Sequence, residues 1–126
     1  MIGACVVLLS LTWAKDGMHH AMATFTLHDL ELSIRERATA RADASYTRTL
    51  LDRGVEYCAK KLGEEAVETV LAAVQEDRAR LIAEAADLIY HLLVVLKARG
   101  IALSDVEAAL AERSKQSGLQ EKMSRS

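Results

Sequence analysis

The chain has 126 residues, of which 51% are hydrophobic, and this is enough apolar material for one compact domain but not for several. It contains no proline and only 4% aromatic residues, so its composition favours helices over strands. A net charge of −2 and a pI near 6.1 exclude a general basic field that would attract nucleic acid or an anionic membrane. We therefore predict an all-α domain with neither of these two partners.

The N-terminal segment, residues 2–13, is almost entirely apolar. It resembles the core of a signal peptide, but no Lys or Arg precedes it, and it is shorter than the roughly 20 residues of a membrane-spanning helix. Ordinary domain sequence starts at Met22, so we expect residues 1–21 to be an apolar extension and residues 22–126 to be the domain. Cys5 and Cys58 do not form the cysteine framework of a secreted domain, which favours the cytoplasm.

Capping residues and apolar spacing predict two helices in the first part of the domain. Thr26 and Asp29 form a capping-box pattern before a helix that ends at about residue 38. Residues 39–45 are small and polar, which indicates a loop. Ser45 then caps a short helix that ends near Gly54.

Three further helices are predicted in the second part. A long helical pattern covers residues 55–75, and Asp77 caps another helix that ends before Gly100. Ser104 and Glu107 form a capping-box pattern for a last helix, which we expect to end at about residue 114. The polar tail from residue 115 predicts a segment that is mobile unless it folds over a ligand.

Residues 92–96 of the fourth helix are all apolar and leave it little polar face. A helix that is apolar all round has to be buried all round. Four or five helices of one chain can hardly cover it, so we expect two chains to combine their helical hairpins into one bundle, as a homodimer with twofold symmetry. The alternative is a monomer whose first and last helices cover this run.

Five acidic residues occupy the two long helices. Glu64, Glu65 and Glu68 lie in the first, and Glu84 and Asp87 in the second. Because residues three apart share a helix face, Glu65 and Glu68 point together, as do Glu84 and Asp87. In an antiparallel hairpin centred on residue 76, Glu65 lies level with Asp87, and Glu68 lies level with Glu84.

Such a cluster of carboxylates carries strong mutual repulsion. Residues 64–87 contain seven acids and two arginines. A hard divalent cation with oxygen ligands, Mg²⁺ or Mn²⁺, relieves this repulsion and suits phosphate chemistry. The alternative is that the acids are solvated helix faces paired with neighbouring lysines and arginines.

Two lysines precede the acids in the first long helix. Lys61 lies level with His91 in the same hairpin, so Lys60, Lys61 and His91 are candidates for binding the outer phosphates of a substrate. The alternative is that the lysines are ordinary exposed residues and His91 is a core histidine. We expect Tyr57 and Tyr90 to be packing residues with a polar tip.

These residues resemble a known family. The strings KKLGEEAVETVLAA, residues 60–73, and EAADLIYHLLVVL, residues 84–96, resemble the E-x-x-E and E-x-x-D halves of the MazG-like all-α nucleotide pyrophosphohydrolase signature. SYTRTLLDRG, residues 45–54, the double lysine, the YHL at residues 90–92 and SGLQEK, residues 117–122, resemble the phosphoribosyl-ATP pyrophosphatase family within it. The resemblance covers roughly residues 24–125.

The resemblance implies a set of site residues. The implied Mg²⁺ ligands are Glu65, Glu68, Glu84 and Asp87. Glu64 is an additional acidic neighbour, and one of Glu64, Glu65 and Glu68 is the expected general base. The implied substrate-binding residues are Lys60, Lys61 and the turn made by Ser45, Tyr46 and Thr47.

The resemblance also implies a reaction. It is the Mg²⁺-dependent hydrolysis of phosphoribosyl-ATP to phosphoribosyl-AMP and pyrophosphate in histidine biosynthesis. One alternative is the same chemistry on another nucleoside triphosphate. A second alternative is a helical dimerisation module without enzymatic activity.

Overall fold

The computed structural model describes residues 24–75 and 77–123, without the side chains of residues 116–119, 121 and 122. The elements in chain order are α1 (Leu27–Ala38), a short 3₁₀ helix η1 (Ala42–Ala44), α2 (Tyr46–Asp52), α3 (Val55–Val74), α4 (Arg78–Ala98) and α5 (Leu103–Met123). No strand occurs in these described residues, which confirms the all-α prediction. The predicted extension, residues 1–21, lies outside them.

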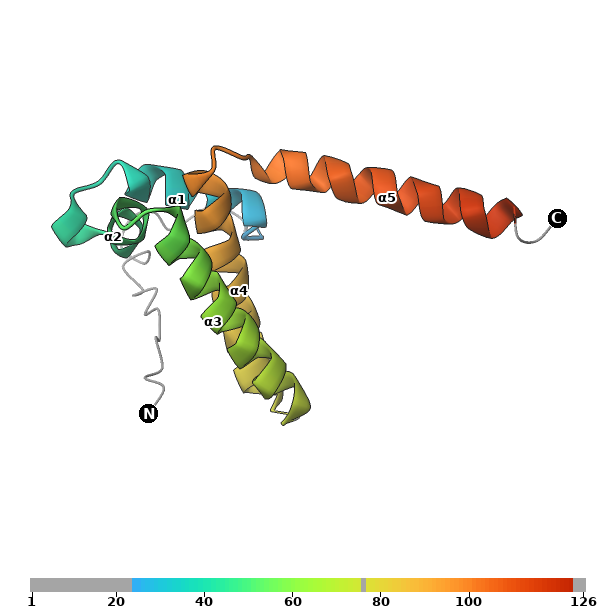
Figure 1. Ribbon diagram of the computed structural model, residues 1–126, viewed down its shortest axis with the longest axis horizontal. Coiled ribbons are helices and arrows are strands. Elements are labelled where there is room, and N and C mark those ends of the chain that lie inside the picture. Colours follow the sequence, from blue (N-terminus) through green and yellow to red (C-terminus); the bar gives the residue numbers. More distant parts are fainter. Residues whose placement is uncertain (1–23, 76, 124–126) are drawn as a thin grey trace.

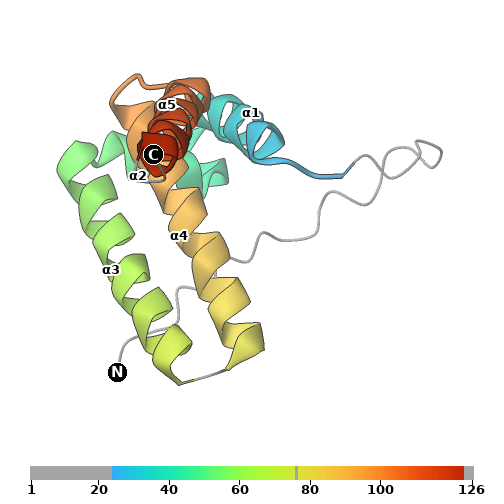
Figure 2. The same ribbon diagram turned by 90° about the vertical axis from the view of Figure 1, so that its right-hand side faces the viewer.

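Helices α3 and α4 form an antiparallel hairpin and lie side by side along their length (Figure 2). Helices α1 and α2 lie against the end of the hairpin where α3 begins and α4 finishes (Figure 1). Helix α5 leaves the same end and extends away from the hairpin (Figure 1). The predicted hairpin is therefore confirmed, and it places the two acidic stretches on neighbouring helices.

The predicted caps of three helices are present. At the start of α1, the Asp29 N–H donates to Thr26 Oγ1 (3.2 Å) and the Thr26 N–H donates to Asp29 Oδ2 (2.8 Å). Ser45 and Asp77 cap α2 and α4, and each side chain accepts the backbone N–H three residues later. Gly100, with a φ of 68°, ends α4 as expected, because it adopts the left-handed conformation that glycine tolerates.

The prediction for the last helix is wrong at both ends. Helix α5 begins at Leu103, so Ser104 lies inside it, and Asp105 is the residue that accepts the Ala102 N–H (3.1 Å). The helix ends at Met123 rather than near residue 114. Residues 115–123 are mostly polar, but Lys, Gln, Glu and Met among them favour helix, so polarity alone is a poor sign of a mobile tail.

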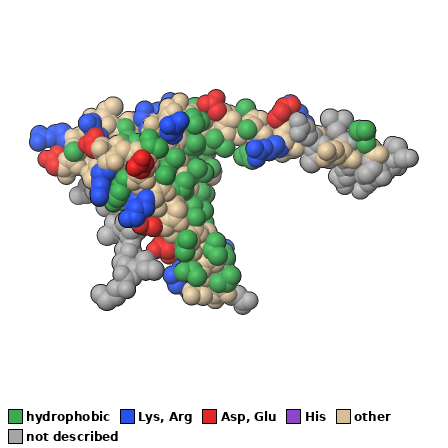
Figure 3. Space-filling view, viewed as in Figure 1, with side chains coloured by type: hydrophobic (Ala, Val, Ile, Leu, Met, Phe, Trp, Pro, Cys, Tyr) green, Lys and Arg blue, Asp and Glu red, His purple; other side chains and the backbone are tan. Residues whose placement is uncertain are grey.

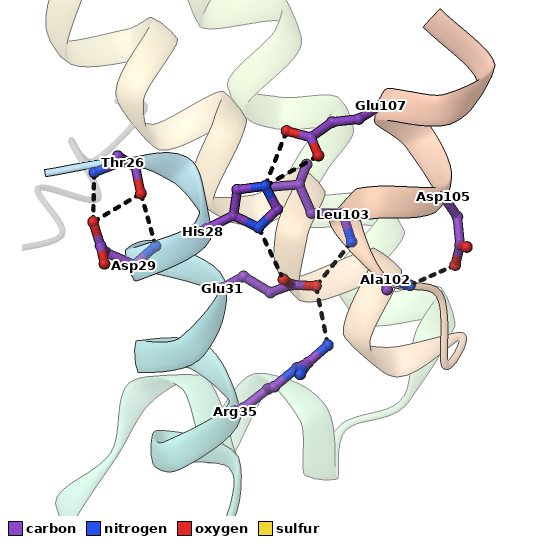
Figure 4. A network of polar contacts seen from close by, with 9 residues as sticks. All are labelled: Thr26, His28, Asp29, Glu31, Arg35, Ala102, Leu103, Asp105 and Glu107. Atoms are coloured by element: carbon purple, nitrogen blue, oxygen red, sulfur yellow. Dashed lines mark hydrogen bonds and ion pairs between the residues drawn. The ribbon is translucent and has the colours of Figure 1, made fainter. Parts of the chain in front are cut away.

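The first turn of α5 is held against α1 by a polar network (Figure 4). Glu31, whose side chain is only 17% exposed, accepts the Leu103 N–H (2.8 Å) and an Arg35 N–H (3.3 Å). The His28 ring lies 3.0 Å from Glu107 and 3.8 Å from Glu31. Helix α1 therefore satisfies an N–H group at the α5 terminus and fixes the direction in which α5 leaves.

One hydrophobic core lies where α1, α2 and the end of the hairpin meet. Its buried residues are Ile34, Leu50, Cys58, Tyr90, Leu93, Val94 and Leu103. Leu93 and Val94 are thus buried within the single chain, but Leu92 is 40% exposed. The expectation that residues 92–96 are buried on all sides is therefore not met by one chain.

The other end of the hairpin exposes an apolar surface, which we call the turn-end patch. It consists of Val67, Val70, Leu71, Val74 and Ile82. These side chains are 40–71% exposed, and Figure 3 shows hydrophobic side chains gathered near the turn of the hairpin. None of the helices in the described part of the chain is long and apolar enough to cross a bilayer.

Candidate functional site

Three acids from the two helices of the hairpin lie together, and we call them the three-acid group. Glu65 on α3 and Glu84 and Asp87 on α4 each offer a carboxylate oxygen, and these oxygens lie within 4.8 Å of one another. Glu65 is almost fully buried, at 2% exposed, and Glu84 and Asp87 are partly buried. The structure thus gathers three of the four acids expected to bind a metal, from positions that the hairpin register places close together.

Glu68, the fourth expected ligand, borders this group. It follows Glu65 by three residues on α3 and lies beside Glu84. Burial is the main cause of the raised pKa of Glu84, and a hydrogen bond to Glu68 and the charge of Glu68 raise that pKa further. The Glu68 carboxylate therefore interacts with Glu84 but does not belong to the three-acid group.

The group carries more negative charge than its surroundings offset. Burial, followed by the charges of Glu68 and Asp87, raises the pKa of Glu65 from 4.5 to about 7, against the opposing effect of Lys61. Burial also raises the pKa of Asp87. In addition, Glu65 Oε2 is buried with no hydrogen-bond partner among the described residues. An acceptor in this state, among close carboxylates, fits a hard divalent cation.

The two lysines and Glu64 form a neighbouring charged cluster. Lys61 Nζ lies 2.9 Å from Glu64 Oε2 and 3.9 Å from Glu65 Oε1, while Lys60 Nζ lies 3.7 Å from Glu64 Oε1. The hydrogen bond from Lys61 is the main reason why the pKa of Glu64 is lowered. Glu64, which is exposed, thus faces the lysines and lies outside the three-acid group, whereas Lys61 lies between the two clusters.

His91 is buried, at 1% exposed, one helical turn beyond Asp87. Its Nδ1 lies 2.9 Å from the Asp87 carbonyl oxygen, and because a carbonyl only accepts, the proton of the ring is on Nδ1. Nε2 is then an acceptor, and it has no hydrogen-bond partner among the described residues. Burial lowers the pKa of His91, so the ring is neutral near pH 7.

The turn made by Ser45, Tyr46 and Thr47 starts α2. The Ser45 hydroxyl donates to the Arg37 carbonyl (3.1 Å) and caps α2, so it is used by the fold. Thr47 is buried, and its hydroxyl lies 2.7 Å from the Tyr90 hydroxyl. Tyr46 is 41% exposed, which makes it the turn residue whose side chain reaches the surface.

Sequence reasoning predicts Tyr90 as a packing residue with a polar tip, but it does not identify Thr47 as the hydrogen-bond partner of that tip. The two residues are 43 positions apart, and no periodicity connects α2 to α4. Only the packing of α2 across the hairpin brings them together, so the sequence held no signal for this contact.

A hollow of about 310 Å³ lies elsewhere, between α1 and the last turns of α4. Ile34, Leu93, Leu96 and Ile101 form its apolar part, with Arg35 and Lys97 among its charged residues. It contains none of the three-acid group. The acids instead lie on a face of a single helical hairpin, where carboxylates rather than concavity define the site.

Fold and site together define an all-α protein with a carboxylate site on a helical hairpin, suited to a divalent cation and to phosphate groups. Residues 27–114 match the family model described as phosphoribosyl-ATP pyrophosphohydrolase. The chain belongs to this family, which confirms the resemblance.

Curated relatives agree with the family match. The chain is 65% identical over 104 residues to "Phosphoribosyl-ATP pyrophosphatase 1" of Bradyrhizobium diazoefficiens, an alignment that covers 82% of this chain and 98% of the relative. It is 59% identical to the protein of the same name from Rhodopseudomonas palustris, with coverage of 82% and 97%. It is 60% identical to "Phosphoribosyl-ATP pyrophosphatase" of Nitrobacter hamburgensis, again with coverage of 82% and 97%.

Proposed function

We propose that the chain hydrolyses the α–β phosphoanhydride bond of phosphoribosyl-ATP in a Mg²⁺-dependent reaction of histidine biosynthesis. Water is consumed, and phosphoribosyl-AMP and pyrophosphate are released. Membership of the family supports the substrate. The observation that carries the metal dependence is the three-acid group, with its buried and unpartnered Glu65 oxygen.

In this proposal Glu65, Glu84 and Asp87 hold the metal, and Glu68 completes the acidic site. When bound, Mg²⁺ supplies positive charge that neutralises phosphate oxygens and orients the phosphate chain for in-line attack. Mn²⁺ shares the preference for oxygen ligands and is expected to substitute. A site made only of carboxylates leaves the remaining ligand positions to water and phosphate, as Mg²⁺ prefers.

The lysines that bind phosphate and the general base all lie on α3. Lys61 and Lys60 bind the outer phosphates, because Lys61 lies 3.9 Å from Glu65 and both ammonium groups would exchange their partner Glu64 for substrate oxygens. The base that takes a proton from the attacking water is one of Glu64, Glu65 and Glu68. Glu64 is the weakest of these candidates, because the lysines favour its charged form and lower its pKa.

Pyrophosphate release from phosphoribosyl-ATP, measured with and without Mg²⁺, tests the proposal. We expect Glu84→Gln and Glu68→Gln each to reduce kcat at least about 100-fold. Glu56→Gln is the matched control, since Glu56 is an exposed acid in the first turn of α3, and it should retain activity. Full Mg²⁺-dependent activity in Glu68→Gln would contradict the proposal, as would release of pyrophosphate from dCTP or dUTP while phosphoribosyl-ATP stays intact.

We further propose that the enzyme is a cytoplasmic homodimer. The turn-end patch and the 40% exposed Leu92 are apolar surfaces that a second hairpin would cover. The buried free thiol of Cys58 supports a reducing compartment.

A further inference from the structure

Tyr46 presents an exposed aromatic ring next to His91. It is the first residue of α2, and its ring lies 6.4 Å from the His91 ring, centroid to centroid, at 83°. His91 in turn contacts the Asp87 backbone. This chain of contacts leads from the three-acid group to a side chain that is 41% exposed.

The ring of Tyr46 is held in place before any ligand arrives. The preceding residue, Ser45, is fixed by its bond to the Arg37 carbonyl, and the following residue, Thr47, is fixed by its bond to Tyr90. The buried Tyr90 ring lies nearly parallel to that of Tyr46, with 18° between the planes and 6.5 Å between the centroids. An exposed ring with this backing loses little conformational freedom when a flat ligand stacks on it.

The ring of Tyr57 carries a cation on its face. The Arg53 guanidinium lies 3.6 Å above its centroid. Tyr90 is buried, at 3% exposed. Of the described tyrosines, Tyr46 is therefore the one that combines an exposed ring with a contact to His91, the neighbour of Asp87.

We propose that Tyr46 is a specificity-determining residue that stacks on the purine base of the nucleotide substrate. This inference rests on the proposed function, because it assumes that the phosphates lie at the three-acid group. A nucleotide held there by its phosphates extends its base away from the metal, and a flat base is the chemical group that an exposed ring recognises. Thr47 and Tyr90 are positioning residues for this ring.

Two variants of Tyr46 in the Mg²⁺-loaded enzyme test the inference. Tyr46→Leu removes the ring, while Tyr46→Phe is the matched control that keeps it. We expect Tyr46→Leu to raise KM for phosphoribosyl-ATP about tenfold and to leave kcat within about twofold, since stacking far from the reacting phosphorus contributes equally to ground and transition states. Titration calorimetry with phosphoribosyl-AMP should show the same tenfold loss, and Tyr46→Phe should stay near wild type in both measurements.

Circular dichroism and Mg²⁺ affinity, both unchanged in Tyr46→Leu, separate loss of stacking from loss of fold. An unchanged KM and product affinity in Tyr46→Leu would overturn the inference, and so would an equal loss in Tyr46→Phe. If the wild-type chain releases no pyrophosphate from phosphoribosyl-ATP, the proposed function fails by itself. In that case the affinity for ATP tests the stacking. A loss of ATP affinity in Tyr46→Leu but not in Tyr46→Phe supports the inference, and any other result rejects it.

Discussion

Glu65 combines deep burial with a pKa raised from 4.5 to about 7. In the metal-free protein the folded state binds this proton more tightly than the unfolded state. The resulting stabilisation is therefore complete below about pH 4.5 and is lost as the pH rises through about 7, a change of roughly 3 kcal/mol. Urea unfolding in the presence of a chelator, between about pH 5 and pH 8, should show this fall in the free energy of unfolding.

The variant Glu65→Gln removes one titrating group and should reduce this dependence, while Glu84 and Asp87, whose pKa values are also raised, retain a part of it. Excess Mg²⁺ should oppose the fall in the wild type, because a ligand that binds only the folded state stabilises it. An unchanged pH dependence in Glu65→Gln would mean that another group causes it.

Glu64 and Glu65 are adjacent in sequence but face different partners, so substitutions at the two positions should affect kcat differently. Glu64 lies with Lys60 and Lys61, whereas Glu65 lies in the three-acid group. We expect Glu64→Gln to lower kcat by less than about tenfold and Glu65→Gln to lower it at least about 100-fold. Steady-state kinetics at saturating Mg²⁺ measures both, and similar losses in the two variants would refute the distinction.

At the scale of elements, α5 depends on α1 for its attachment. Glu31→Ala leaves the Leu103 N–H without its acceptor, so we expect a loss of about 1–2 kcal/mol in the free energy of unfolding and faster amide exchange at Leu103. His28→Ala removes an exposed contact with Glu107 and a longer one with Glu31, and leaves the Leu103 N–H bonded, so it should cost less than about 1 kcal/mol. Glu36→Ala is the control on the exposed face of α1. A larger effect in His28→Ala than in Glu31→Ala would contradict this order.

The elements themselves were predictable where local chemistry decides them. Thr26, Ser45 and Asp77 cap helices as their sequence patterns indicate, because a cap needs only residues three positions apart. The start of α5 was not predictable in the same way. Ser104 and Glu107 match a capping box, but Glu107 pairs with His28, which is 79 residues away in sequence. A tertiary contact thus decides between two local alternatives.

At the scale of the whole molecule, the site was likewise predictable only where spacing along the chain decides it. Helix periodicity and hairpin symmetry were enough to place Glu65 near Asp87, because both follow from the number of residues to the turn. The lysine pairs of Glu64 follow equally from spacing, because they lie three and four residues away on the same helix. Burial of Glu65 and the bond between Thr47 and Tyr90 instead depend on how α2 and the side chains pack. Sequence spacing contains no information about such packing between distant segments.

The turn-end patch is an apolar surface that the described part of one chain leaves exposed. Isolated exposed apolar residues are ordinary, but five of them on adjacent turns of one hairpin indicate a partner surface. A second copy offers the same patch, so a twofold axis beside the hairpin would bury both at once.

Val70, which is 61% exposed at the centre of the patch, therefore provides a test. Val70→Glu would place an unpaired charge in the proposed dimer interface, which costs several kcal/mol, so we expect sedimentation velocity to show a dimer for the wild type and a monomer for this variant. Leu32→Glu is the matched control, because Leu32 is 54% exposed on α1, away from the hairpin turn, and it should leave the dimer intact. A wild-type monomer, or a Val70→Glu dimer of unchanged affinity, would show that the patch is not the interface.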